Sequence, residues 1–239
     1  ARGRVDPLGG ALRMSAPGRP ASLGVVAVAG ATGLVGRCLV QQLCADPAVT
    51  TVHALARRPL DVAHPKLVMH VVDFTALPAL PALDAVFLAL GTTIQIAGSQ
   101  ARFRAVDFDA NLAAARMAQA AGARRAALVS AMGANARSRV FYSRVKGELE
   151  EALAALGLDA LVIARPSMLR GDRAQLGQPV RAGELRWARL DAWLRPLIPA
   201  NYRAIDAADV AAALRRQLPT AQGRVVLPSG AMQGASQTV

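Results

Sequence analysis

Tyr142 and Lys146 stand four residues apart in a chain of 239 residues that has only two tyrosines and two lysines. On a helix, positions i and i+4 share a face, so the phenol and the ammonium would point toward one site. A neighbouring ammonium favours the phenolate form, which brings the phenol within reach of acid–base work near neutral pH. The structural alternative is an amphipathic helix with an exposed lysine.

Ser130 ends a predicted strand twelve residues before Tyr142. A hydroxyl at that place could hold a substrate oxygen while the phenol gives or takes a proton. We therefore take Ser130, Tyr142 and Lys146 as the candidate catalytic residues.

Gly30, Gly33 and Gly36 form a G-x-x-G-x-x-G motif directly after a predicted strand and at the start of an amphipathic helix. Glycines here allow a tight turn, close approach of the backbone to a pyrophosphate and close packing of helix on strand. The helix N-terminus then supplies N–H donors and a positive dipole. The motif predicts a dinucleotide site, and a glycine-rich turn without a ligand is the alternative.

Arg57 and Arg58 follow the second predicted strand, where an NAD site carries an acidic residue for the ribose 2′-hydroxyl. Guanidinium groups suit a 2′-phosphate both by charge and by bidentate geometry. No Asp or Glu lies between Val49 and Leu60 to repel that phosphate. The sequence therefore favours NADP(H) over NAD, and two solvated arginines in an arginine-rich chain are the alternative.

Short apolar runs alternate with alanine-rich helical stretches from residue 23 onward. The runs are apolar on both faces, which is typical of parallel strands covered by helices on both sides. This order predicts an α/β fold, a Rossmann-type doubly wound parallel sheet that binds ligands beyond the carboxyl ends of its strands. The predicted helices lie near 34–44, 101–121, 143–156 and 207–218, and the predicted strands are Val25–Ala29, Val52–Ala56, Leu67–Asp73, Ala85–Leu90, Ala127–Ser130, Ala160–Ala164 and Arg224–Leu227.

We expect a single NAD(P)-binding domain over residues 21–239, preceded by a flexible extension over 1–20 with Met14 near the natural start. The extension and the apolar run after it imitate a signal peptide, but that run is short and continues into the glycine motif. The Pro-interrupted stretch 165–205 is expected to form a small basic lobe over the substrate. Its segment Glu184–Leu197 has an apolar helical stripe, which favours packing on the core or a lid over membrane attachment.

The formal net charge is +12, and nearly all of the basic residues are arginines. This bias is typical of a GC-rich genome, and the arginines are scattered among few aromatic residues, so we expect no nucleic-acid partner.

Cys38 and Cys44 form no CxxC pair, which favours the reducing cytoplasm of a bacterium. The three histidines share no ligand spacing, so no metal is predicted. No window approaches the ~18 apolar residues of a membrane span.

These motifs together resemble the short-chain dehydrogenase/reductase (SDR) superfamily, and within it the atypical branch similar to the TIP30-like oxidoreductases. The resemblance covers roughly residues 23–218. It rests on GATGLVG (30–36), ALARRPL (54–60), VDF (72–74), ALGTTIQIAGSQARFRAVD (89–107), AGARRAALVSAMGA (121–134), FYSRVKGELEEAL (141–153) and ARPSMLRGDR (164–173).

The resemblance implies roles for individual residues. Tyr142 would be the proton donor or acceptor, and Lys146 would bind the nicotinamide ribose and favour the phenolate. The helical asparagine that assists proton relay in many members corresponds to Asn111 in this comparison. In the implied cofactor site, the glycine loop would bind the pyrophosphate, and the two arginines would bind the adenosine phosphate end. Asp73 and Phe74 would lie beside the adenine. Residues 90–92 would lie under the adenine-side ribose, and residues 166–167 would border the nicotinamide. The whole cofactor-binding set is Gly30, Thr32, Gly33, Leu34, Val35, Gly36, Arg57, Arg58, Asp73, Phe74, Leu90, Gly91, Thr92, Lys146, Pro166 and Ser167.

Two functions arise as hypotheses. The first is an NADP(H)-dependent oxidoreductase that transfers hydride between the nicotinamide and a small carbonyl or alcohol. The short chain after Arg165 favours a small substrate over a nucleotide sugar, and the basic lobe would suit an acidic one. The second is a non-catalytic NADPH-binding sensor or regulatory interaction protein. Either would act as a monomer or a homodimer.

Overall fold

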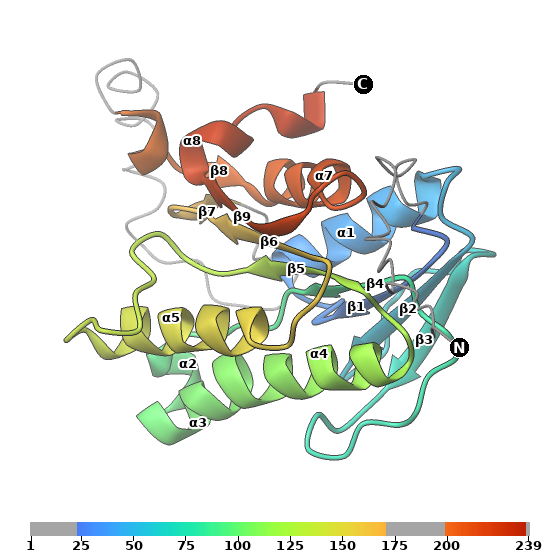
Figure 1. Ribbon diagram of the computed structural model, residues 1–239, viewed down its shortest axis with the longest axis horizontal. Helices are drawn as coiled ribbons and strands as arrows, with labels where there is room; N and C mark the ends of the chain where they lie inside the picture. The colour runs from blue at the N-terminus through green and yellow to red at the C-terminus, as the bar shows by residue number, and fades with distance from the viewer. Residues whose placement is uncertain (1–22, 171–198, 238–239) are drawn as a thin grey trace, which may run out of the picture.

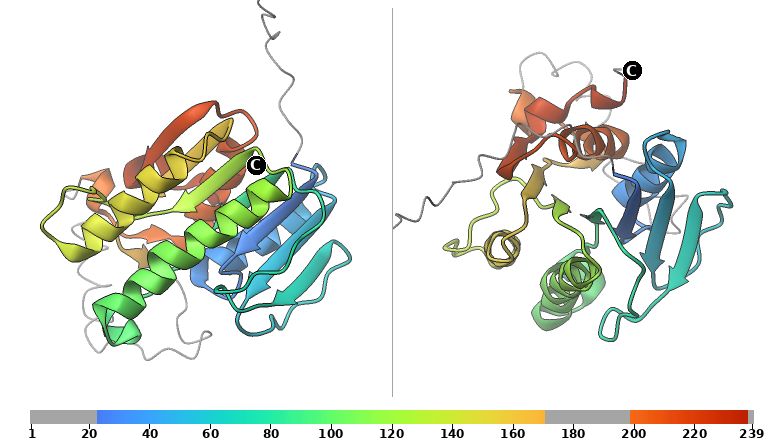
Figure 2. Two further views of the ribbon diagram at one scale, coloured as in Figure 1. Left: turned by 60° about the horizontal axis from the view of Figure 1, so that its bottom comes forward. Right: turned by 45° about the vertical axis from the view of Figure 1, so that its right-hand side comes forward.

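The computed structural model describes residues 23–170 and 199–237. Within these residues a parallel sheet runs in the order β3-β2-β1-β4-β5-β6-β9, with helices on both of its faces (Figures 1 and 2). This order is that of a doubly wound Rossmann sheet, which confirms the predicted fold class. The strands are β1 (Val25–Ala29), β2 (Thr51–Ala56), β3 (Leu67–Val71), β4 (Ala85–Leu88), β5 (Arg125–Val129), β6 (Ala160–Arg165) and β9 (Gly223–Pro228).

Alternate residues of the central strands enter two separate cores. In β1, Val26 and Val28 pack with helices α1 (Leu34–Ala45) and α7 (Ala207–Gln217), whereas Ala27 and Ala29 face α4 (Asn111–Ala120) and α5 (Phe141–Ala154). Successive side chains of a strand point to opposite faces, so a strand buried on both sides must be apolar throughout. The outer strands β3 and β9 are only partly buried, because each has a neighbour on one side alone.

The helix predicted over 101–121 is present but is divided into three parts. Residues Gln100–Arg104 (α3) and α4 are α-helical, and Ala105–Ala110 (η1) between them is a π-helix. A π turn accommodates an additional residue and rotates the rest of the helix after it, and such turns are frequent at functional sites. Periodicity alone did not predict this interruption.

Two short strands beyond β6 were also not predicted. Leu169–Arg170 (β7) pairs in parallel with Ile205–Asp206 (β8), and the Ser167 hydroxyl donates to the carbonyl of Arg203. The two ends of the stretch expected as a lobe are therefore joined. The remaining short elements are α2 (Ile94–Ala97), a 3-10 turn at Ala200–Tyr202, α8 (Ser229–Met232) and a 3-10 turn at Ala235–Gln237.

Several expectations concern residues that the structure does not describe. The flexible extension over 1–20 and the amphipathic segment Glu184–Leu197 lie outside the described residues, as does most of the 165–205 lobe. Within the described residues, no helix combines the length and apolarity needed to cross a membrane.

Candidate functional site

The glycine loop connects β1 to α1 at the carboxyl edge of the sheet. Gly30 has φ +86°, and a Cβ there would lie 2.7 Å from the backbone of Ala89, just beyond β4. A Cβ on Gly36 would lie 2.1 Å from the Gly30 carbonyl oxygen. The first position thus needs glycine for its conformation and for space, and the last for the close packing of α1 on the turn.

The N-terminus of α1 is open to an anion. Its capping residue, Gly33, has no side chain to accept the first N–H groups, and the first turn carries no acidic residue. Thr32 and Leu34 are half-buried beside it, while Val35 turns into the core. Orphan N–H groups at the positive end of a helix dipole suit a pyrophosphate, so these residues fit the cofactor that the sequence implies.

Arg57 and Arg58 lie beside this loop. The Leu55 carbonyl at the end of β2 accepts hydrogen bonds from the N–H groups of Gly30 and Ala31, at 3.0 and 3.4 Å. Both arginines are exposed, and neither forms an ion pair with another residue of the described ranges. The guanidinium groups are therefore free to meet a phosphate at the adenosine end of a dinucleotide.

Asp73 and Phe74 lie farther out, after β3. The N–H of Thr75 donates to the Asp73 carboxylate at 2.9 Å, and this backbone hydrogen bond lowers the pKa of Asp73 below its ordinary value. Phe74 is half-buried against the core on the α4 face. Their place beside adenine stays a prediction.

Lys146 is buried, and its ammonium forms an ion pair with Asp107 of the π-helix, with Nζ 2.7 Å from Oδ1. The other carboxylate oxygen of Asp107 accepts the N–H of Thr92 at 2.8 Å. A Cβ on Gly91 would lie 3.6 Å from Asp107 Oδ1 and 3.9 Å from Lys146 Nζ. The structure thus brings Gly91, Thr92 and Lys146 together at the end of β4, next to half-buried Leu90.

Tyr142 is half-buried one helical turn before Lys146 on α5. Its ring centroid is 5.5 Å from that of Phe103, which is fully buried on α3. The shared face predicted from the four-residue spacing is therefore present. Lys146 is not an exposed lysine on a solvated helix face.

The hydrogen bonds of the Asn111 side chain go to backbone carbonyls. Its side-chain amide donates to the backbone carbonyls of Leu90 and Asp107, at 3.1 and 3.0 Å. These bonds join the π-helix to the end of β4, so the Asn111 side chain holds backbone in place. The residue that pairs with the lysine is Asp107, one turn earlier on the helix, and a relay role for Asn111 stays a prediction.

Ser130 is buried at the end of β5, and its hydroxyl donates to Glu150 Oε1 at 2.6 Å. Glu150, on α5, also accepts from Arg165 at 3.0 and 2.6 Å and from Arg224 at 2.8 Å. This cluster ties the helix that carries Tyr142 to β5, β6 and β9. The hydroxyl oxygen keeps lone pairs for a further donor, so the substrate role of Ser130 stays a prediction.

We expect Glu150→Ala to lower the free energy of unfolding by about 3 kcal/mol, because it deletes four charge-assisted hydrogen bonds to a carboxylate that is itself almost fully buried. Urea unfolding followed by circular dichroism measures this. The matched control is Asp159→Ala, which breaks the exposed Arg124–Asp159 pair and should cost far less. Equal losses in the two variants would contradict a stabilising role for the cluster.

Pro166 and Ser167 follow β6. Pro166 is buried, and its carbonyl accepts the N–H of Met132 at 2.9 Å, so the loops after β5 and β6 lie together. The Ser167 hydroxyl donates to Arg203 and lies 3.0 Å from the Ser229 hydroxyl. Both residues lie at the carboxyl edge, and their contact with nicotinamide stays a prediction.

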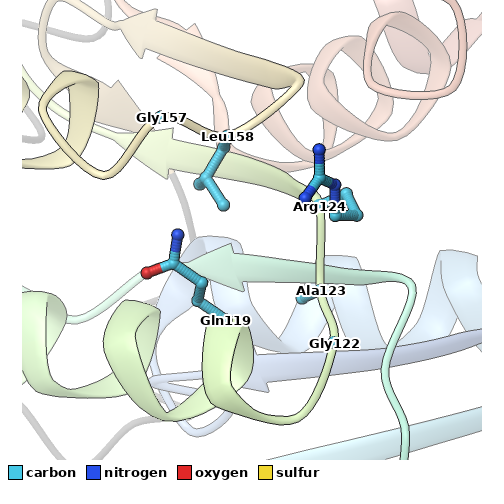
Figure 3. A pocket seen from close by; sticks show the side chains of 6 residues that line it. All are labelled: Gln119, Gly122, Ala123, Arg124, Gly157 and Leu158. Atoms are coloured by element: carbon cyan, nitrogen blue, oxygen red, sulfur yellow. The ribbon is translucent and has the colours of Figure 1, made fainter.

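A small cavity of about 140 Å³ lies at the opposite edge of the sheet (Figure 3). Its lining residues directly precede β5 and β6, so it lies at the amino ends of these strands. Parallel sheets bind nucleotides beyond the carboxyl ends. This cavity is therefore separate from the glycine loop and from Lys146. It is lined by Gln119, Gly122, Ala123, Arg124, Gly157 and Leu158.

Residues 30–219 match the family described as NAD(P)H-binding. The chain belongs to the NAD(P)H-binding family. This family match begins at the first glycine of the loop and includes the whole candidate site. A relative named "Protein FMP52, mitochondrial", from Candida albicans, is 34% identical over 194 residues, which are 77% of this chain and 82% of that protein.

Solved structures agree with the fold of this NAD(P)H-binding chain. An oxidoreductase of the short-chain dehydrogenase/reductase family from Burkholderia thailandensis superposes with a TM-score of 0.61 at 19% identity, covering 88% of this chain and 93% of that one. MoeE5 in complex with UDP-glucose and NAD superposes with a TM-score of 0.62 at 20% identity, covering 85% and 75%. The chain thus has the fold of these short-chain dehydrogenase/reductase structures, and its family match indicates a site for a nicotinamide cofactor.

The relatives contradict the expected source and location. The Candida albicans relative is a fungal protein named as mitochondrial, so the expectation of a bacterial, cytoplasmic protein is wrong. That expectation rested on arginine bias and on two cysteines without a pairing motif. Such features report nucleotide composition and the absence of disulfides, and neither distinguishes one reducing compartment from another.

Proposed function

We propose that this protein is an NADP(H)-dependent oxidoreductase of the SDR type, which transfers hydride between the nicotinamide and a small carbonyl or alcohol substrate. The observation that carries the proposal is the buried Lys146 ammonium at the end of β4, one helical turn from Tyr142 and across the edge from the open helix N-terminus at Gly33. A dinucleotide with its pyrophosphate at Gly33 and its nicotinamide ribose at Lys146 would bring its reactive ring to the phenol.

The bound nicotinamide would give or take the hydride. Tyr142 would protonate the substrate oxygen during reduction and accept the proton back during oxidation. Lys146 would hold the ribose hydroxyls with the ammonium hydrogens that Asp107 does not occupy, and its charge would favour the phenolate. Ser130 would accept a hydrogen bond from the O–H of an alcohol substrate, and it would have to release Glu150 to donate to a carbonyl oxygen. The joined ends of the 165–205 stretch would border the substrate.

The test is turnover of a panel of small aldehydes, ketones and quinones, including acidic ones, followed by the absorbance of NADPH. We expect oxidation of NADPH with at least one member. The hydrogen bond from Ser130 to Glu150 favours one competing function, a non-catalytic NADPH sensor, because it occupies the serine hydrogen. NADPH binding without turnover across the whole panel would support that sensor and reject the enzyme.

We expect NADPH to bind about ten- to a hundred-fold more tightly than NADH, because one charge-assisted hydrogen bond is worth roughly 1.5–3 kcal/mol. The double variant Arg57→Ala/Arg58→Ala should lose this preference, and added salt should weaken it in the unmodified protein. Fluorescence titration with both cofactors measures the effect. Arg124→Ala, at the opposite edge of the sheet, is the control and should keep the preference. Equal affinities in the unmodified protein would reject the NADP assignment.

A further inference from the structure

Two helices meet at the catalytic tyrosine and lysine through matched pairs of side chains. Phe103 and Asp107 are four residues apart on the α3–η1 helix, and Tyr142 and Lys146 are four residues apart on α5. Phe103 packs against the Tyr142 ring, and Asp107 pairs with Lys146. Since an α-helix rises 1.5 Å per residue, the carboxylate of Asp107 lies about one turn from the phenol.

Asp107 is held on both of its oxygens. Its side chain is 1% exposed and that of Lys146 is 5% exposed, so solvent screens their interaction little. Oδ1 meets the ammonium and Oδ2 accepts the Thr92 N–H, which fixes the carboxylate between the π-helix and the loop after β4. A carboxylate held in this way sets the position of the ammonium and also opposes its charge.

We propose that Asp107 is a positioning residue that fixes the Lys146 ammonium beside Gly91 and balances its charge, so that Tyr142 keeps its proton to a higher pH than Lys146 alone would allow. This role rests on the proposed function of Tyr142 as the acid. The sign is set by charge: an ammonium lowers the pH at which a nearby phenol ionises, and a carboxylate raises it.

The other charged groups around this pair are compensated or exposed. On α5, Glu148 forms ion pairs with Arg144 and with Arg104 of α3, and Glu150 is neutralised by arginines on the strands. In the loop before α5, Arg137 and Arg139 are exposed. On η1, Asp109 is exposed. Asp107 is therefore the carboxylate in contact with Lys146.

The experiment measures the ionisation of the Tyr142 phenol directly and needs no substrate. Tyr142 and Tyr202 are the only tyrosines, so Tyr202→Phe leaves one phenol whose ionisation can be followed by the ultraviolet absorbance of phenolate. In this full-length background, Asp107→Asn should lower the titration midpoint by about one pH unit, the order of effect expected when one nearby charge is removed. Glu148→Gln removes an equal charge from a more exposed pair and should shift the midpoint less than half as far.

A second pair of variants makes the test independent of how well Asp107→Asn folds. Lys146→Met should raise the midpoint. Asp107→Asn/Lys146→Met removes both charges and should return it close to that of the Tyr202→Phe parent. An Asp107→Asn midpoint that stays in place or rises, or a double variant whose midpoint stays as high as that of Lys146→Met, would overturn the proposal. If the midpoints follow this pattern but the protein turns over no substrate, the role of Asp107 is supported and only the proposed enzymatic function is rejected.

Discussion

Tyr142→Phe should lower turnover of an accepted carbonyl substrate by about a thousand-fold while leaving NADPH affinity within a factor of two. The phenylalanine ring can keep the packing against Phe103, where the ring centroids are 5.5 Å apart, so the variant removes little besides the O–H group. Positioned proton transfer contributes typically 10²–10⁴-fold to a rate, which sets the size of the expected loss. Steady-state kinetics and a cofactor titration on the same preparation measure both quantities.

The control for this prediction is Tyr202→Phe. Tyr202 is 67% exposed in the short 3-10 turn at Ala200–Tyr202, and we expect its replacement to leave kcat unchanged. If Tyr142→Phe retained more than about a tenth of the original turnover, the phenol would not be the acid. A loss of NADPH affinity in parallel with turnover would instead indicate that the ring supports the cofactor site.

Gly30→Ala should abolish measurable cofactor binding and lower the free energy of unfolding by about 3 kcal/mol. Gly30 has φ +86°, where an alanine is strained. The added Cβ would lie 2.7 Å from the carbonyl carbon and oxygen of Ala89 and from the N–H nitrogen of Leu90. These are backbone atoms at the end of a central strand, so the glycine loop must move and the helix N-terminus moves with it. Thermal unfolding and NADPH titration measure the two effects.

Gly157→Ala separates the two causes of that loss. Gly157 also has a left-handed conformation, with φ +67°, but nothing lies within 4 Å of an added Cβ. This variant should therefore show only the conformational cost, about 1 kcal/mol, and should bind NADPH normally. If both glycine variants lost the same stability and both bound NADPH, the close approach of Gly30 to β4 would not matter for the site.

The order of strands and helices could be predicted because burial on both sheet faces requires runs that are apolar throughout. β1 was predicted at its observed bounds, and β2, β5 and β6 within one or two residues. The strands β7 and β8, which form a separate two-stranded sheet, escaped prediction because two-residue strands have no periodicity to detect. The π-helix escaped because a local insertion leaves the apolar pattern on either side intact.

Two acidic residues near the site were missed, although the sequence carried a signal for both. Asp107 falls in the apolar stripe of its helix, between Phe103 and Ala114, and Glu150 falls between Leu149 and Leu153 on α5. A carboxylate is rarely buried without a partner, so a charged residue in a buried stripe predicts one. The partner itself was not predictable, because Lys146 lies 39 positions from Asp107, and Arg224 lies 74 from Glu150.

The sequence by itself determined the doubly wound fold, the glycine turn and the shared helix face of Tyr142 and Lys146, because each depends on residues near one another along the chain. Only the tertiary structure decided which group meets Lys146, because that contact depends on the rotation of the π-helix against α5. The same holds for Ser130, whose hydrogen bond to Glu150 arises where β5 and α5 pack together. Local propensity sets the elements, whereas the contacts between side chains depend on how those elements pack.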